Sequence, residues 1–204
     1  MSGGRVEPVR ARVMSIALVG MPGSGKSTVG RQLSRQLSWD FVDSDAVLEK
    51  RLGMSIREWF ARHGEDAFRD EEQAVIEDLT QREGIVIATG GGAVLRPSNR
   101  NALHSRCHVF YLRASPEELF RRVRHDTQRP LLQVDDPLAR LRELYRERDP
   151  LYRRTAHFVV ESARPSVQSL TSMVMMQLEL AGIAAPPPRE APPGEPRDKG
   201  LDET

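Results

Sequence analysis

The stretch "GMPGSGKST" at residues 20–28 directly follows the apolar run "IALV" at residues 16–19. It matches the pattern G-x-x-x-x-G-K-[ST], whose last two positions are Lys26 and Ser27 here. Between a buried strand and a helix, such a loop turns successive backbone N–H groups inward, and the positive end of the helix dipole adds to them. The stretch therefore predicts a phosphate-binding loop and a strand–loop–helix fold around it.

The side chains of this loop indicate which phosphate compound it holds. Lys26 supplies a point charge for the β and γ phosphates, and the Ser27 hydroxyl is placed to ligate Mg²⁺. We therefore expect a nucleoside triphosphate and Mg²⁺. The predicted nucleotide-binding residues of the loop are Gly23, Ser24, Gly25, Lys26, Ser27 and Thr28.

Working outward from the loop, short apolar runs alternate with helical patterns. The expected strands are 13–20, 39–43, 84–90, 107–112 and 156–160. The expected helices are 26–38, 45–81 with breaks near Gly53 and near His63 and Gly64, 97–105, 116–124, 136–149 and 166–180. This alternation predicts an α/β, three-layer fold with a five-stranded parallel sheet flanked by helices, whose ligands bind beyond the carboxyl ends of the strands.

Length and composition limit the other possibilities. The 204 residues carry a formal charge of +1 and one cysteine, which favours one reduced, cytoplasmic domain without nucleic-acid or membrane partners. We expect a monomer that binds a small molecule. The predicted domain covers residues 13–182, after a flexible leader at 1–12 and before a disordered proline-rich tail at 183–204.

Two other classes of nucleotide-binding protein fit poorly. A GTPase would read guanine with an N-K-x-D segment, which is absent around the three lysines of this chain. A motor-type ATPase would end its strand at 84–90 with an acid, but here Thr89 is followed by three glycines. Without Cβ atoms, glycines let another molecule approach the sheet edge closely, so this segment is expected to contact a substrate.

The acids appear instead at the end of the second predicted strand, in "FVDSDAV". Asp43 and Asp45 can serve as caps of the next helix, which is the ordinary role of acids at such a position. A carboxylate beside a triphosphate loop can also orient a hydroxyl nucleophile and accept its proton. Both interpretations remain open, and they are compatible.

Six motifs together resemble the shikimate kinase family. They are "GMPGSGKST", "DSD", "FRDEE" at 68–72, "TGGGAV" at 89–94, "RPLL" at 129–132 and "PLYRR" at 150–154. The resemblance spans about residues 14–180. It implies a kinase that transfers the γ-phosphate of ATP to the 3-hydroxyl of shikimate, a step toward aromatic amino acids.

The same resemblance implies roles for residues on the substrate side. Asp45 would bind the accepting hydroxyl and act as the base, while Asp43 would hold the magnesium ion through water. Arg69 and Arg153 would grip the substrate carboxylate, and Glu72 would orient Arg69. A planar guanidinium matches a carboxylate with two parallel hydrogen bonds, so this choice is chemically sound. The glycines that line the substrate ring would be Gly90, Gly91 and Gly92.

On the nucleotide side, the resemblance implies a mobile lid at about 124–135. Arg129 of this lid would meet the phosphates and, with Lys26, stabilise the transferring charge. Arg164 would contribute to the adenine-facing loop. Such a lid would also exclude water, which could otherwise hydrolyse ATP.

Two alternatives from the same reasoning are a kinase of another small acid, such as a gluconate-type kinase, and a non-catalytic nucleotide-binding regulator. The first would prefer gluconate as acceptor. The second would be expected to lack the base or the lid arginine, whereas Asp45 and Arg129 are both present.

Overall fold

The computed structural model describes residues 13–124, 134–162 and 166–183. Its centre is one sheet of five parallel strands in the order β2-β3-β1-β4-β5. The strands are β1 (Ser15–Val19), β2 (Asp40–Asp43), β3 (Ile85–Ala88), β4 (Cys107–Arg113) and β5 (Phe158–Glu161). The predicted number of strands and their parallel arrangement are confirmed.

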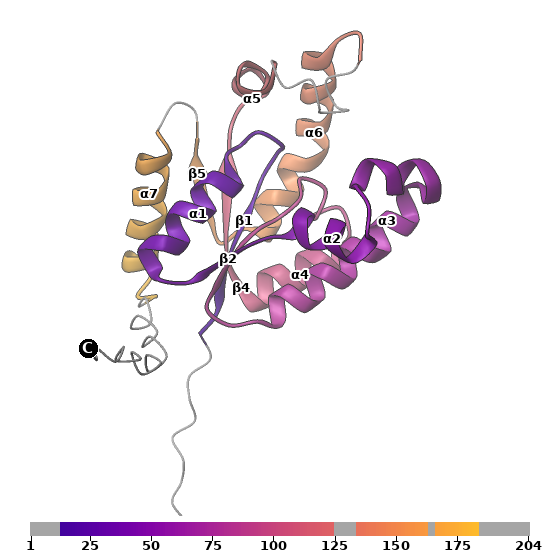
Figure 1. Ribbon diagram of the computed structural model, residues 1–204. Helices are drawn as coiled ribbons and strands as arrows, with labels where there is room; N and C mark the ends of the chain where they lie inside the picture. The colour runs from indigo at the N-terminus through magenta and orange to yellow at the C-terminus, as the bar shows by residue number, and fades with distance from the viewer. Residues whose placement is uncertain (1–12, 125–133, 163–165, 184–204) are drawn as a thin grey trace, which may run out of the picture.

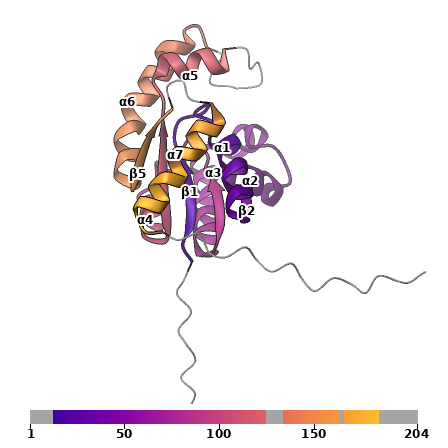
Figure 2. The ribbon, with the colours of Figure 1, turned by 90° about the vertical axis from the view of Figure 1, so that its left-hand side faces the viewer.

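Helices cover both faces of this sheet, giving three layers (Figure 1, Figure 2). Helices α1 (Lys26–Leu37) and α7 (Val167–Leu180) pack together on one face. The other side carries α2 (Ser44–Leu52), α3 (Ile56–Gln81), α4 (Pro97–Arg106), α5 (Pro116–Val123) and α6 (Pro137–Thr155). In the part of the chain that is described, no helix has both the length and the apolar character needed to cross a membrane.

Strand β1 shows why its apolar run is continuous. Ile16 and Leu18 belong to the apolar cluster shared with α1 and α7, whereas Ala17 and Val19 belong to the cluster on the opposite face. Successive side chains of a strand point to opposite faces, so a strand covered on both sides must be apolar at every position. All four of these residues are buried. This burial fixes the strand that carries the phosphate loop.

The predicted interruptions between residues 45 and 81 are also found. Gly53 ends α2 in the left-handed conformation, with φ 68° and ψ 13°. Gly64 has φ 80° and ψ −179° inside α3, where two helical pieces meet. Side chains disfavour both conformations, which explains why glycine occupies each position.

The predicted end of the last long helix before β5 is wrong. Helix α6 does not stop at residue 149 but continues through Pro150 to Thr155. Proline costs the helix one backbone hydrogen bond. The buried Tyr152 and Thr155 anchor the last turns in the core, and this packing outweighs the local cost of Pro150. The helix therefore sets the directions in which the side chains after Pro150 point.

Candidate active site

The loop at residues 20–28 joins the carboxyl end of β1 to α1, as predicted. Strand β1 lies between β3 and β4, so the loop is at the point where the strand order reverses, which is the usual ligand position in such sheets. Gly25 precedes the helix with φ 95°, a conformation that suits glycine. The buried Lys26 donates hydrogen bonds from Nζ to the carbonyl oxygens of Gly20 at 2.8 Å and Met21 at 3.0 Å.

A cavity of about 380 Å³ opens beside this loop. It brings together many of the predicted site residues from separate parts of the chain. Its lining residues are Pro22, Gly23, Gly25, Lys26, Ser27, Thr28, Asp43, Asp45, Thr89, Gly91, Arg122 and Val123. Ser24, which was also predicted to bind the nucleotide, is not part of this lining. It is fully buried, and its hydroxyl has no hydrogen-bond partner among the described residues.

Asp43 caps a helix and also contacts the phosphate loop. Its Oδ1 accepts a hydrogen bond from the backbone N–H of Asp45 at 3.1 Å, which makes Asp43 the cap of α2. Its Oδ2 accepts a hydrogen bond from the Ser27 hydroxyl at 2.7 Å. A hydroxyl and a carboxylate side by side match the oxygen ligands of Mg²⁺, which keeps several waters and substrate phosphates in its coordination sphere. The residues therefore fit a magnesium ion carried in with a nucleotide.

Asp45 follows in the first turn of α2 and faces Gly90 so closely that a Cβ at Gly90 would collide with its carboxylate. Burial and, to a smaller extent, the neighbouring Asp43 raise the pKa of Asp45, Lys26 lowers it, and the net result is a pKa of about 6. A carboxylate with a raised pKa is a stronger base than an ordinary one. Asp45 therefore combines a position in the cavity with the basicity that proton transfer needs.

Arg69 reaches the third glycine of the predicted substrate segment. Its guanidinium lies so close to Gly92 that any Cβ there would collide with it. Its Nη1 donates to Glu72 Oε2 at 2.7 Å, so the predicted contact with Glu72 is present. Glu72 is buried, and burial raises its pKa while Arg69 opposes that shift. Glu72 therefore holds the Arg69 guanidinium at the inner side of the site.

Arg153 is not brought to this site. It lies on the outer side of α6, where its Nε donates to Asp149 Oδ2 at 2.8 Å and its side chain is 46% exposed. Arg148, five residues earlier on α6, faces inward instead. Its Nη1 donates to the carbonyl of Gly91 at 3.3 Å, and its buried Nε has no hydrogen-bond partner among the described residues. Arg148 is therefore the arginine of α6 that faces the glycine segment.

Tyr152 strengthens the same connection between α6 and the glycine segment. Its hydroxyl donates to the carbonyl of Gly91 at 2.5 Å, and its ring stacks on Tyr111 of β4 with centroids 4.9 Å apart. Both tyrosines are fully buried. Helix α6 thus fixes the position of Gly91 through a hydroxyl and a guanidinium.

Arg122 also lines the cavity, although no sequence motif marks it among its neighbours. It donates a hydrogen bond from Nη2 to the carbonyl of Ser162, after β5. Arg129, Arg164 and nearly all of the expected lid lie outside the described residues.

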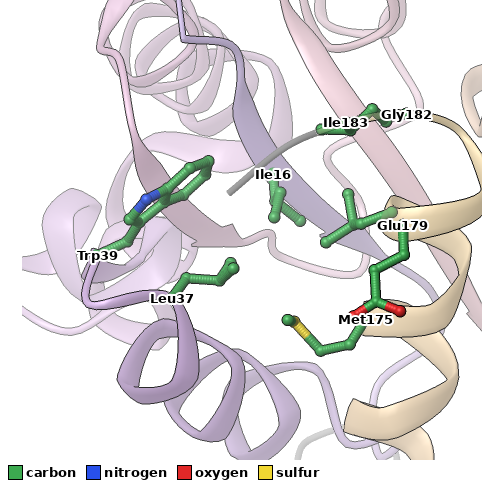
Figure 3. Close-up of a pocket in the computed structure, with 8 residues that line it drawn as sticks. Ile16, Leu37, Trp39, Met175, Glu179, Gly182 and Ile183 are labelled. Carbon is green, nitrogen blue, oxygen red and sulfur yellow. The ribbon is translucent and has the colours of Figure 1, made fainter. Parts of the chain in front are cut away.

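A second cavity, of about 400 Å³, lies near the amino end of β1 (Figure 3). Apolar side chains such as Ile16, Leu37 and Trp39 line it, and Glu179 is the one ionisable group in its lining. This cavity has no phosphate-binding backbone and no pair of opposite charges. Phosphate binding is therefore expected at the cavity beside Lys26.

Comparison with known proteins agrees with this geometry. A sequence profile for shikimate kinase matches residues 22–179. The shikimate kinase of Paracidovorax citrulli is 58% identical over 183 residues, which cover 88% of this chain and 100% of that protein. This chain belongs to the shikimate kinase family. The shikimate kinase of Burkholderia thailandensis is 56% identical over 85% of this chain and 95% of its own length.

Solved shikimate kinases share the fold. The enzyme from Acinetobacter baumannii, solved in complex with shikimate, has a TM-score of 0.79 and 41% identity, covering 83% of this chain and 94% of its own. The shikimate kinase from Aquifex aeolicus has a TM-score of 0.74 and 34% identity, covering 83% and 99%. A gluconokinase from Sinorhizobium meliloti, at 20% identity and a TM-score of 0.52 over 85% and 98%, shares only the fold. Sequence similarity therefore favours shikimate kinase over the gluconate-type alternative.

Proposed function

We propose that this chain transfers the γ-phosphate of ATP to the 3-hydroxyl of shikimate, giving shikimate 3-phosphate and ADP. The observation that carries the proposal is the position of Asp45 in one cavity with Lys26 and the glycine segment. A basic carboxylate lies there between a triphosphate loop and a surface suited to a small acid. Membership of the shikimate kinase family supports the same reaction.

The loop after β1 would hold the triphosphate. Gly23 and Gly25 leave room for phosphate oxygens beside the backbone N–H groups, and the amino end of α1 adds its dipole. Lys26 would turn its ammonium from the carbonyls of Gly20 and Met21 toward the β and γ phosphates. The reaction then proceeds through positioning and charge stabilisation.

The acid substrate would lie against Gly90, Gly91 and Gly92. Arg69 reaches this segment from α3 at Gly92, and Arg148 reaches it from α6 at the adjacent Gly91. Two guanidinium groups can bind a carboxylate and leave the hydroxyls of the ring free to point toward Asp45. This arrangement explains why an acid with several hydroxyl groups would be selected.

Asp45 would orient the 3-hydroxyl and accept its proton while the γ-phosphoryl group leaves ADP. Because its pKa is raised to about 6, the carboxylate is still ionised at neutral pH and is a better base than an exposed aspartate. Its burial excludes water that would compete for the phosphoryl group.

Ser27 and Asp43 would hold the magnesium ion, which when bound neutralises charge on the β and γ phosphates. The remaining proposed contacts are Arg129, from a lid at about 124–135, and Arg164 near the adenine. Their support is the family resemblance, because both residues lie outside the described part of the chain.

We further propose that residues 13–182 are the catalytic unit and that it acts as a monomer in the cytoplasm. The described site residues all come from one chain, so the site does not require a second copy. The chain has a single cysteine, the buried Cys107, so it cannot form an internal disulfide, which fits a protein of a reducing compartment.

A coupled assay of ADP release tests the proposed reaction. With ATP and Mg²⁺, shikimate should support rapid turnover and gluconate should not. Isothermal titration with shikimate should give saturable binding, with and without ADP. A preference for gluconate, or no saturable binding of shikimate, would contradict the proposal.

A further inference from the structure

Arg69, which binds the substrate carboxylate under the proposed function, already holds two carboxylates of its own chain. Glu72 accepts a hydrogen bond from Nη1 at 2.7 Å. Glu65 Oε1 accepts two hydrogen bonds, from Nε at 3.2 Å and from Nη2 at 3.0 Å. The Nε and Nη2 groups lie on one edge of the guanidinium, and arginine binds carboxylates through two parallel N–H groups of such an edge. Glu65 therefore occupies a carboxylate-binding edge of Arg69.

The two acids differ in their surroundings. The Glu72 side chain is 4% exposed, whereas the Glu65 side chain is 61% exposed. Glu72 is therefore fixed inside the fold. Glu65 can rotate into solvent without leaving a buried charge behind, because water can hydrate its carboxylate.

The backbone also allows Glu65 to move. It directly follows Gly64, whose φ of 80° and ψ of −179° separate the two helical pieces of α3. A Cβ at Gly64 would meet no other atom within 4 Å, so space surrounds this joint. Glu65 is thus the first residue of the second helical piece, where a change of side-chain position disturbs few other contacts.

From these observations we propose that Glu65 is an internal competitor of the substrate carboxylate. In the substrate-free enzyme its carboxylate occupies the Nε and Nη2 edge of Arg69. When the acid binds, its carboxylate takes this edge, Glu65 turns into solvent, and Glu72 retains Nη1. Glu65 thereby lowers the affinity for the acid and keeps the Arg69 guanidinium oriented while the site is empty.

The size of the effect follows from exposure. The Glu65 side chain is 61% exposed and the Arg69 side chain 12%, so the pair belongs at the upper end of the range for surface pairs, about 1 kcal/mol, and displacing Glu65 weakens acid binding by about fivefold. Displacing the buried Glu72 would cost far more, because its charge would lose its partner in a dry environment. The acid is therefore expected to replace Glu65 and not Glu72.

The test is the variant Glu65→Gln, which keeps the size of the side chain and removes its charge. Isothermal titration should show tighter binding of shikimate by about two- to fivefold. In steady-state kinetics KM for shikimate should fall, while kcat, KM for ATP and the melting temperature stay unchanged. This division between KM and kcat distinguishes competition from a general loss of structure. Glu65→Ala should act in the same direction.

Glu143→Gln is the matched control. Glu143 is 59% exposed and forms an ion pair with Arg140 within α6, away from the glycine segment. Removing its charge should change neither shikimate binding nor KM. A shift equal to that of Glu65→Gln would show that net charge, and not competition, causes the effect.

Unchanged or weaker binding of shikimate in Glu65→Gln would overturn the inference. Glu65 would then only orient Arg69 and would not compete with the substrate. The variant Arg69→Met separates this failure from failure of the proposed function. If wild type binds shikimate and Arg69→Met does not, the function stands whatever Glu65→Gln shows. If wild type does not bind shikimate, both the function and the inference are wrong.

Discussion

Arg148 and Arg153 belong to the same helix, but only Arg148 donates a hydrogen bond to the carbonyl of Gly91, at 3.3 Å. Arg153 pairs with Asp149 at the exposed side of α6, with 2.8 Å between Nε and Oδ2. Five positions on a helix correspond to a rotation of about 140°, so the two side chains must leave in different directions. We therefore expect Arg148, and not Arg153, to be the arginine of α6 that contacts the substrate.

We expect Arg148→Ala to lower kcat/KM for shikimate by about tenfold to a hundredfold, the range for losing hydrogen bonds from a charged group. Arg153→Ala should change kcat/KM by less than about threefold, since an exposed ion pair contributes little. Steady-state kinetics of both variants check the prediction. The reverse ranking would return Arg153 to the role that its motif suggests.

Asp45→Asn should leave ATP binding nearly unchanged and lower kcat by about a hundredfold or more, because the positioned base is lost. Asparagine has the same shape, so the contact with Gly90 and the cap of α2 should persist. Titration with ATP and turnover with saturating shikimate measure the two quantities. Normal turnover in this variant would exclude Asp45 as the base.

Lys26→Met should weaken the transition state more than the ground state, because charge develops during the transfer. We expect kcat/KM to fall by about a hundredfold or more, while the dissociation constant for ATP rises less. Lys26 also binds the carbonyls of Gly20 and Met21, so the melting temperature should be recorded in parallel. Equal losses in ATP binding and in kcat/KM would show that Lys26 binds ATP without stabilising the transition state further.

The histidines at the amino ends of β4 and β5 predict a pH dependence of stability. His157 Nδ1 accepts a hydrogen bond from the Val109 N–H at 3.1 Å, and its ring stacks on His104 with centroids 4.3 Å apart. Burial lowers the pKa of His157, and the neighbouring His104 and His108 lower it further. Folded His157 therefore stays neutral at a pH where the unfolded chain is protonated.

The free energy of unfolding therefore depends on pH at this position. Below about pH 6.5 the unfolded state binds more protons at this position, so the free energy of unfolding falls as the pH decreases toward the lowered pKa. His157→Asn keeps an acceptor for Val109 without a titrating group. Its melting temperature should decline less than that of wild type between about pH 7 and pH 5. The exposed His63 provides a control, since His63→Asn should follow wild type.

Local patterns predicted the parts of the site that lie within one segment. The phosphate loop depends on one local motif, and a cap at the start of α2 is expected from the acids Asp43 and Asp45. The contact of Glu72 with Arg69 is implied by the family resemblance. The inward position of Arg148 depends on helix α6 continuing through Pro150, which tertiary packing decides. Arg122 enters the cavity because α5 lies beside the end of β5, and no local pattern contains that information.

The positions of the two tryptophans have an optical consequence. Trp39 lines the apolar cavity at the far end of β1, whereas Trp59 contacts His63 in the piece of α3 that precedes Gly64, with the two rings tilted and their centroids 4.1 Å apart. Emission from Trp39 should be insensitive to the acid and can serve as an internal reference. Emission from Trp59, on the same helix as Arg69 and Glu65, should respond when the acid replaces Glu65, so the unlabelled protein carries its own fluorescent reporter of substrate capture.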